Sequence, residues 1–193
     1  MVKSVVSHAN EWACRLLESR GFEAVRYYWQ MRIDLDEEIP EAVWPEGVGV
    51  RTAVPGEDDR EVHALVQEQF KDIEHQEKSP FEEWHEIMME GENFDPSTWF
   101  LTVADGEIVG VALCPAYEHE GWVRQVAVRR DWRRRGLATA LLRTAFAEFR
   151  RRGKPHAGLV VDSYNTSGAM SVYESAGMRV HRQYDGYEKR IRE

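Results

Sequence analysis

A short loop rich in arginine is the part of this sequence best suited to hold an anion. The loop reads Arg133, Arg134, Arg135, Gly136, Leu137 and Ala138. An alternating apolar segment precedes it at residues 122–128, and a helical pattern follows it at residues 137–149. The first N–H groups of a helix have no partner within the helix, and the helix dipole adds partial positive charge there. Gly136 lets a ligand approach the backbone closely. The order strand, loop, helix therefore predicts a site for phosphate or pyrophosphate.

Two other phosphate motifs do not fit this loop. A nucleoside-triphosphate loop ends in Gly-Lys-Ser/Thr, whereas Leu137 and Ala138 follow Gly136 here. A dinucleotide fingerprint has three glycines after the first strand of a βαβ unit. This loop has one glycine and lies late in the chain. Taken alone, the loop also fits a basic turn that caps a surface helix.

The residues around the loop narrow the interpretation. Four features of the sequence follow one another along the chain: Val126-Ala127-Val128, the R-x-x-G-x-A loop at 133–138, Asn165, and Tyr173-Glu174-Ser175-Ala176-Gly177-Met178. Together they resemble the GNAT superfamily of N-acetyltransferases, over about residues 46–193. The resemblance implies an α/β (α+β) fold, the GNAT fold, in which a mixed, mostly antiparallel central sheet is flanked by helices.

The resemblance also implies where acetyl-coenzyme A binds. In this family it lies where the fourth and fifth strands splay apart, beside a bulge that leaves backbone amides unpaired. By matching position, the backbone of Val126, Ala127 and Val128 pairs with the pantetheine arm and polarises the thioester carbonyl. A buried strand is the plain alternative for that stretch. The residues expected around the pyrophosphate are Arg133, Arg134, Arg135, Gly136, Leu137, Ala138 and Thr139. Asn165 either binds the pantetheine arm or caps the helix that follows it.

Tyr173 is the predicted catalytic acid. Attack of an amine on a thioester expels a thiolate, whose conjugate acid resembles cysteine, with a pKa of about 8.5. A phenol with a pKa of about 10 can protonate that thiolate as it forms. The spacing from Asn165 to Gly177 favours this role over the alternative, a tyrosine on the apolar face of a short helix.

The catalytic base is less well defined. A lysine-like amine, with a pKa of about 10.4, must lose a proton before it attacks. Many relatives carry a glutamate on the fourth strand, but residues 122–126 contain no acid. Glu118 and His119 precede that strand and are candidates to act through water; solvated loop residues are the alternative. An acceptor amine of low pKa needs no base.

Several aromatic residues are candidates to line the acceptor pocket, with the hydrophobic core as the alternative: Phe70, Trp84, Phe94, Trp99 and Tyr187. His75 is a further candidate on the acceptor side.

Composition and charge limit the class of protein. The 193 residues, 42% of them hydrophobic, suffice for one globular core. Neither an apolar run of about 18 residues nor a signal pattern is present, so we expect a cytoplasmic protein without membrane association. Cys14 and Cys114 have no metal-type spacing, so no metal is expected.

The net charge is −9, yet residues 124–152 hold ten arginines and two acids. This distribution favours a small polyanionic ligand over nucleic acid.

The N-terminal segment echoes the C-terminal one. Residues 16–22 resemble residues 172–178 at an offset of 156, and Tyr28 aligns with Tyr184 at the same offset. Leu17 takes the place of the tyrosine. We therefore divide the chain into a partial GNAT-like repeat tail at 1–40 (helix plus strand), a linker at 41–47 and an acetyltransferase domain at 48–193. This organisation is similar to that of double acetyltransferases of the mycothiol-synthase type. A longer tandem protein, a decayed repeat and a chance match are the three explanations.

The remaining elements follow from periodicity. Residues 25–35 alternate as a strand, which we expect to pair with the main sheet or with another subunit, as in a homodimer. Strands are expected at residues 48–54, 98–104, 108–116 and 122–129, and helices at residues 58–72, 81–89 and 137–149. Asp105-Gly106 is a hairpin signal.

These features predict direct transfer of an acetyl group from acetyl-coenzyme A to a primary amine of a small molecule or peptide, in a ternary complex. No covalent enzyme intermediate is required, because the thioester is already activated. The alternative is a non-catalytic module that binds an acyl-coenzyme A and regulates a partner.

Overall fold

The computed structural model describes residues 1–36, 38–70, 79–163 and 168–190, with the backbone alone at 69 and 70. Its strands are β1 Val2–Ser7, β2 Glu23–Asp34, β3 Gly49–Thr52, β4 Trp99–Ala104, β5 Glu107–Leu113, β6 Gly121–Trp122, β7 Gln125–Val128, β8 His156–Asp162 and β9 Arg179–Lys189. Its α-helices are α1 Glu11–Ser19, α2 Asp59–Phe70, α3 Phe81–Met89, α4 Leu137–Arg151 and α5 Ala169–Ser175. Short 3₁₀ turns lie at Pro96–Thr98 and Arg130–Trp132.

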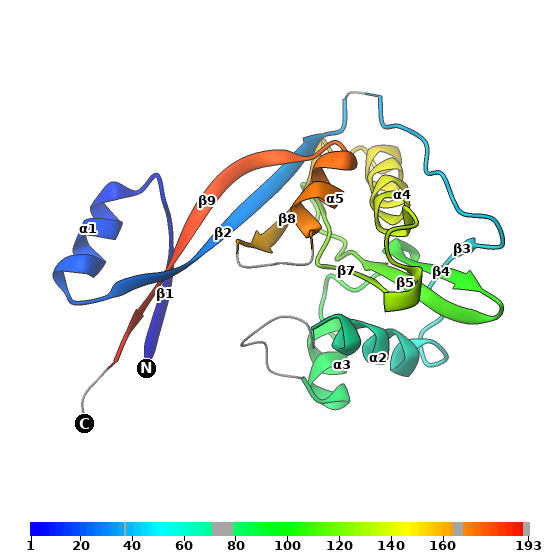
Figure 1. Ribbon diagram of the computed structural model, residues 1–193, viewed down its shortest axis with the longest axis horizontal. Coiled ribbons are helices and arrows are strands. Elements are labelled where there is room, and N and C mark those ends of the chain that lie inside the picture. Colours follow the sequence, from blue (N-terminus) through cyan, green and yellow to red (C-terminus); the bar gives the residue numbers. More distant parts are fainter. Residues whose placement is uncertain (37, 71–78, 164–167, 191–193) are drawn as a thin grey trace.

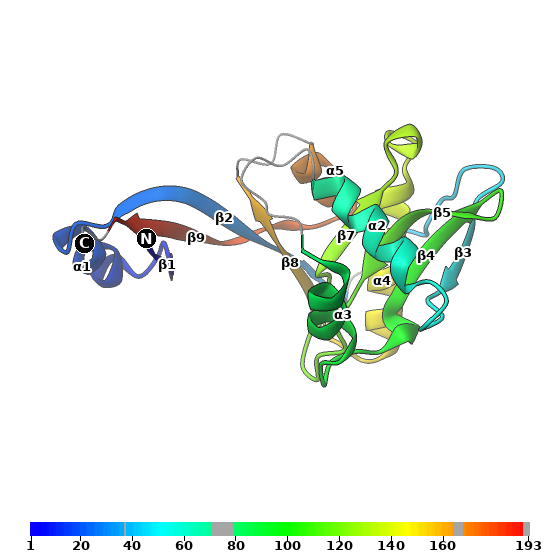
Figure 2. The same cartoon turned by 90° about the horizontal axis from the view of Figure 1, so that it is seen from below.

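The strands form two sheets, in the orders β3-β4-β5-β7 and β1-β9-β2-β8-β6. Every described strand pair is antiparallel except β6 with β8, which is parallel. Helices α2 and α3 lie on one side of the four-stranded sheet and α4 lies on the other (Figures 1 and 2). The predicted fold class, a mostly antiparallel mixed sheet flanked by helices, is confirmed.

Local sequence explains the hairpin between β4 and β5 and the packing of helix α4. Asp105 and Gly106 have φ values of 52° and 81°, and two positive φ values are what a tight type I′ hairpin between β4 and β5 requires. Helix α4 buries one apolar stripe, made by Leu137, Leu141 and Ala145. That stripe packs against both sheets, so α4 fixes their relative position.

The N-terminal strand β2 is an integral part of the sheet. It lies between β8 and β9, with Met31 opposite Leu159 and Tyr28 opposite Tyr184. The expectation that this strand pairs with the main sheet is confirmed. Met31, Ile33 and Leu35 are buried in the same core cluster as α4.

Met31→Ala should therefore destabilise the whole protein. Met31 is fully buried, and truncation of such a side chain leaves a cavity that costs about 2–5 kcal/mol. Val25→Ala, on the same strand but 40% exposed, should change the free energy of unfolding by at most about 0.5 kcal/mol. Urea unfolding of both variants measures the difference. Equal, small effects would show that β2 adds little to the core.

An arm projects from the body of the molecule. It consists of β1, α1 and the outer parts of β2 and β9 (Figures 1 and 2). Strand β1 was not predicted from the sequence, and it pairs with β9. Helix α1 has no buried residue, and Trp12 on it is 69% exposed. The arm therefore adds sheet edge and apolar surface rather than core.

Candidate active site

The fourth strand of the acetyltransferase-like region divides between the two sheets. The Val123 N–H donates to the Gly158 carbonyl, at 2.9 Å, and the next N–H, of Arg124, donates to the Leu113 carbonyl, also at 2.9 Å. The first half, β6, thus pairs with β8, and the second half, β7, pairs with β5. The sequence predicted one continuous strand over 122–129, so the structure corrects that prediction.

Beyond this division the two sheets separate. Strand β7 ends the order of the four-stranded sheet, and in β8 the residues after Gly158 pair with β2 alone. Within the described part of the chain, one edge of β7 is therefore left without a neighbouring strand. Arg124 and Gln125 both lie opposite Leu113, an arrangement of two residues against one that defines a β-bulge. An open strand edge beside a bulge is the geometry that the resemblance implied.

A cavity of about 660 Å³ opens beside this edge. Its size is typical of a small-molecule site. The residues that line it are Val126, Val128, Arg130, Trp132, Arg133, Arg134, Gly136, Leu137, Ala138, Thr139, Gly168, Ala169, Ser171, Val172 and Tyr173. The fold thus brings β7, the arginine loop, the start of α4 and helix α5 around one space. Of the described residues predicted to bind the cofactor, Ala127 and Arg135 lie outside this lining.

The start of α4 offers backbone donors to this cavity. The first bond of the helix ladder runs from the Ala140 N–H to the Gly136 carbonyl, at 3.0 Å, so the N–H groups of residues 137–139 precede the ladder. Gly136 has a φ of 86° and caps the helix without a side-chain hydrogen bond. A Cβ atom built there would meet nothing within 4 Å. Open space therefore faces these donors, as anion binding requires.

The arginines of the loop have different surroundings. The Arg133 Nε donates to the Val128 carbonyl, at 3.2 Å, and so ties the loop to β7. The Arg135 guanidinium stacks over the Trp132 ring, 4.7 Å from its centroid. Arg134 has a φ of 62°, which is unusual for a residue with a side chain, and it is exposed at the cavity. The loop is thus held in shape by two arginines while Arg134 faces the cavity.

Tyr173 lies on α5 and lines the opposite wall. It packs against the core cluster that contains α4. Burial raises the pKa of the Tyr173 phenol above its ordinary value, because a low-polarity environment disfavours the phenolate. The hydroxyl is therefore protonated at neutral pH and able to donate a proton.

Glu118 and His119 lie outside this cavity, on the loop between β5 and β6. Their side chains are 87% and 88% exposed and lie 3.8 Å apart. Their placement agrees with the solvated alternative as well as with a base that acts through water. Asn165 and His75 lie outside the described residues, as does the side chain of Phe70.

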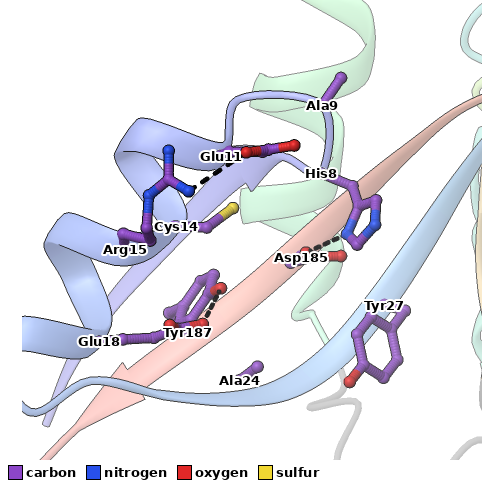
Figure 3. A pocket seen from close by; sticks show the side chains of 10 residues that line it. All are labelled: His8, Ala9, Glu11, Cys14, Arg15, Glu18, Ala24, Tyr27, Asp185 and Tyr187. Atoms are coloured by element: carbon purple, nitrogen blue, oxygen red, sulfur yellow. Dashed lines mark hydrogen bonds and ion pairs between the residues drawn. The ribbon is translucent and has the colours of Figure 1, made fainter.

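The aromatic candidates for the acceptor pocket separate into three groups. Trp84 and Trp99 are buried between the sheet and helices α2 and α3, so they belong to the core. Phe94 is half-buried and packs edge-on against Trp99. Tyr187 lies instead on the arm, where it lines a different pocket (Figure 3). Tyr187 therefore does not lie at the cavity beside β7, because β9 carries it away from the body.

That pocket of the arm has a volume of about 490 Å³. Its polar groups pair with one another (Figure 3): His8 with Asp185 at 2.7 Å, and the Tyr187 hydroxyl with Glu18 at 3.1 Å. Arg15 donates to Glu11, at 3.2 Å. Pairing of this kind leaves few groups to recognise a ligand, so the cavity beside β7 is the stronger candidate.

Residues 60–178 match the Acetyltransferase (GNAT) family. The chain belongs to the GNAT family of acetyltransferases. It is 33% identical, over 91% of its length, to the mycothiol acetyltransferase of Streptomyces coelicolor, and 35% identical, over 82%, to that of Acidothermus cellulolyticus. It covers 57% and 53% of those two proteins, so it spans little more than half the length of these curated relatives.

Solved structures of GNAT proteins show the same fold. A GCN5-related N-acetyltransferase from Sphaerobacter thermophilus is 38% identical, with a TM-score of 0.84 over 97% of this chain and 59% of that one. A tandem GNAT protein from the clavulanic acid biosynthesis pathway shares the fold at 15% identity, with a TM-score of 0.69 over 96% of this chain and 62% of that one. Among the described residues, no helix is long and apolar enough to span a membrane. In the same part of the chain, no three His, Cys, Asp or Glu side chains are grouped to hold a metal ion.

Proposed function

We propose that this GNAT protein transfers an acetyl group from acetyl-coenzyme A to a primary amine, in a ternary complex. The observation that carries the proposal is the single cavity that joins the open edge of β7, the start of α4 and Tyr173. Each of the three parts meets a different need of the reaction. The name of the curated relatives supports the reaction class, and we take no acceptor from it.

The two ends of the cavity suit the two ends of the cofactor. The N–H groups of residues 137–139, with Arg134 beside them, bind the pyrophosphate through backbone donors and charge. The open edge of β7 binds the pantetheine arm as an added strand would, through Val126 and Val128. The thioester then lies near the bulge. Asn165 is proposed as a further contact to this arm.

The chemistry needs one proton donor and a neutral amine. The amine nitrogen bonds to the thioester carbonyl carbon, while backbone N–H groups of β7 stabilise the charge on its oxygen. When the C–S bond breaks, the electron pair leaves with sulfur, and Tyr173 donates its proton to that thiolate. The amine proton passes to water or to a base. Glu118 and His119 are proposed for that base.

We also propose that residues 1–40 derive from a repeat of the α5–β9 region. The register supports this, because Tyr28 pairs with Tyr184, Arg26 with Gly186 and Gln30 with Arg182. With the offset of 156, Arg26 corresponds to Arg182 and Gln30 corresponds to Gly186, so one pair is converted into the other. A local twofold axis between the two strands would produce this relation. The neighbouring strands have a similar arrangement: β1 pairs with β9 and β8 pairs with β2, with Ser7 opposite Tyr184 and Asp162 opposite Tyr28, one residue from the position that the offset gives.

Calorimetric titration with acetyl-coenzyme A, free coenzyme A and ATP tests the proposed cofactor. Micromolar binding of acetyl-coenzyme A, with ATP much weaker, is the expected result. A transfer assay that detects free thiol, run on a panel of primary amines, then tests the reaction. Cofactor binding without transfer to any amine would favour the alternative, a module that binds acyl-coenzyme A and regulates a partner. Absence of binding at millimolar ligand would overturn the assignment of the loop.

A further inference from the structure

A second, smaller pocket lies on the other side of the divided strand. Its volume is about 70 Å³. The residues that line it are Ile87, Met88, Gly91, Asn93, Phe94, Trp99, Pro115, Tyr117 and Arg124. Met88 and Trp99 belong to the core cluster between the sheet and helices α2 and α3, whereas Val126 and Val128 of the large cavity pack with the α4 cluster. The two spaces thus approach the bulge from opposite faces of the sheet.

The bulge determines which face Arg124 joins. In a regular strand Arg124 and Gln125 would point to opposite faces. Because both residues lie opposite Leu113, the bulge interrupts this alternation and re-aims one side chain. Arg124 consequently lines the pocket under α3. Val126 follows two residues later, about 7 Å along the strand at about 3.3 Å per residue, and it lines the large cavity.

No described side chain compensates the charge of Arg124. Its side chain is exposed and, within the described ranges, makes no ion pair or hydrogen bond. Other arginines of this region are paired: Arg129 with Glu61 and Glu107, and Arg152 with Asp95 and Glu148. Among the residues that the structure describes, no acidic one lines the small pocket. A cation at the rim of a pocket without a described acidic residue attracts an anionic group.

Size narrows the ligand further. The small pocket, at about 70 Å³, is much smaller than the cavity beside β7, at about 660 Å³, so it suits a small group such as a carboxylate rather than a whole acceptor.

We propose that this small pocket is an acceptor subsite, and that Arg124 binds a carboxylate carried next to the acceptor amine. The acceptor is then an amino acid, held by its carboxylate at Arg124, with the amine nitrogen directed across the bulge to the thioester. This inference rests on the proposed acetyl transfer and specifies its substrate class. Arg124 is a specificity-determining residue in this proposal.

Acceptors with and without the carboxylate provide the test, compared at equal concentrations of neutral amine because amidation also lowers the pKa of the amine. We would measure kcat/KM with glycine, leucine and phenylalanine and with their C-terminal amides, for the wild type and for Arg124→Gln. The wild type should prefer the acids by about 30-fold or more, as expected for loss of a charge-assisted contact. Arg124→Gln should reduce this preference to about threefold or less, mainly through KM. Arg150→Gln, which changes an exposed arginine at the far end of α4, is the matched control.

The outcomes separate this inference from the function on which it rests. Transfer to acids and amides with equal efficiency would overturn the anion subsite and leave the acetyltransferase assignment in place. Transfer to amides alone, or an unchanged preference in Arg124→Gln, would do the same. Failure of the wild type to bind acetyl-coenzyme A would overturn both. Thermal unfolding of each variant shows that a loss of preference is not a loss of fold.

Discussion

Replacement of Gly136 by aspartate is expected to weaken acetyl-coenzyme A binding by at least about 100-fold. The glycine has a φ of 86°, and the space beyond its Cα is open. An aspartate side chain would occupy that space and place a negative charge where the pyrophosphate is proposed to lie. It would also accept hydrogen bonds from the N–H groups that the phosphate needs, as N-cap carboxylates do. Steric, electrostatic and hydrogen-bond effects therefore act in the same direction.

Gly153→Asp is the matched control for this variant. Gly153 has a φ of 74°, and a Cβ there would also meet nothing within 4 Å, but it follows the opposite end of α4. Both substitutions carry the cost of a left-handed backbone, about 1–2 kcal/mol. Only Gly136→Asp should alter the dissociation constant in a calorimetric titration. Equal affinities for the two variants would show that the pyrophosphate lies elsewhere.

Much of the fold could be predicted because its signals are local. The hairpin at Asp105-Gly106 and the helices α3 and α4 depend on residues close together in the sequence. The arginine loop was predicted for the same reason, since a strand, a glycine and a helix start are all visible within about fifteen residues. Most of the predicted cofactor residues accordingly line one cavity.

The remainder depends on contacts between distant residues. The apolar alternation of residues 122–128 has no feature that marks a division, because the division is made by Gly158 and Leu113 in two other strands. The position of Tyr187 depends on how far β9 extends into the arm. Strand β1 is short and mostly exposed, so its sequence carries little amphipathic signal.

The bulge shows why the acceptor side was harder to predict than the cofactor side. The cofactor is bound largely by backbone groups at the start of a helix, whose position follows from the helix itself. The acceptor side depends on which face Arg124 joins, and that depends on a register shift of one residue. A sequence pattern indicates the face of a regular strand but not the place where its regularity is interrupted.

Tyr173→Phe should lower kcat by about 100-fold or more and leave the affinity for acetyl-coenzyme A nearly unchanged. Loss of a general acid typically costs 10²–10⁴-fold in rate, and the phenylalanine ring preserves the packing against the α4 cluster. Tyr27→Phe, which removes a hydroxyl from the exposed arm, is the control and should retain full activity. Single-turnover rates with a good acceptor measure the effect; full activity of Tyr173→Phe would remove this tyrosine from the mechanism.

The pH dependence provides an independent check on the same residue. Because burial raises the pKa of Tyr173 above its ordinary value, the proton-bearing form persists at neutral pH and is lost only as the pH rises through that raised pKa, above about 10. The wild-type kcat should therefore not decline between about pH 7 and pH 9. Tyr173→Phe should lack the decline at still higher pH. A rise in the wild-type rate with pH through this range, absent from the variant, would mean that Tyr173 acts as a phenolate rather than as an acid.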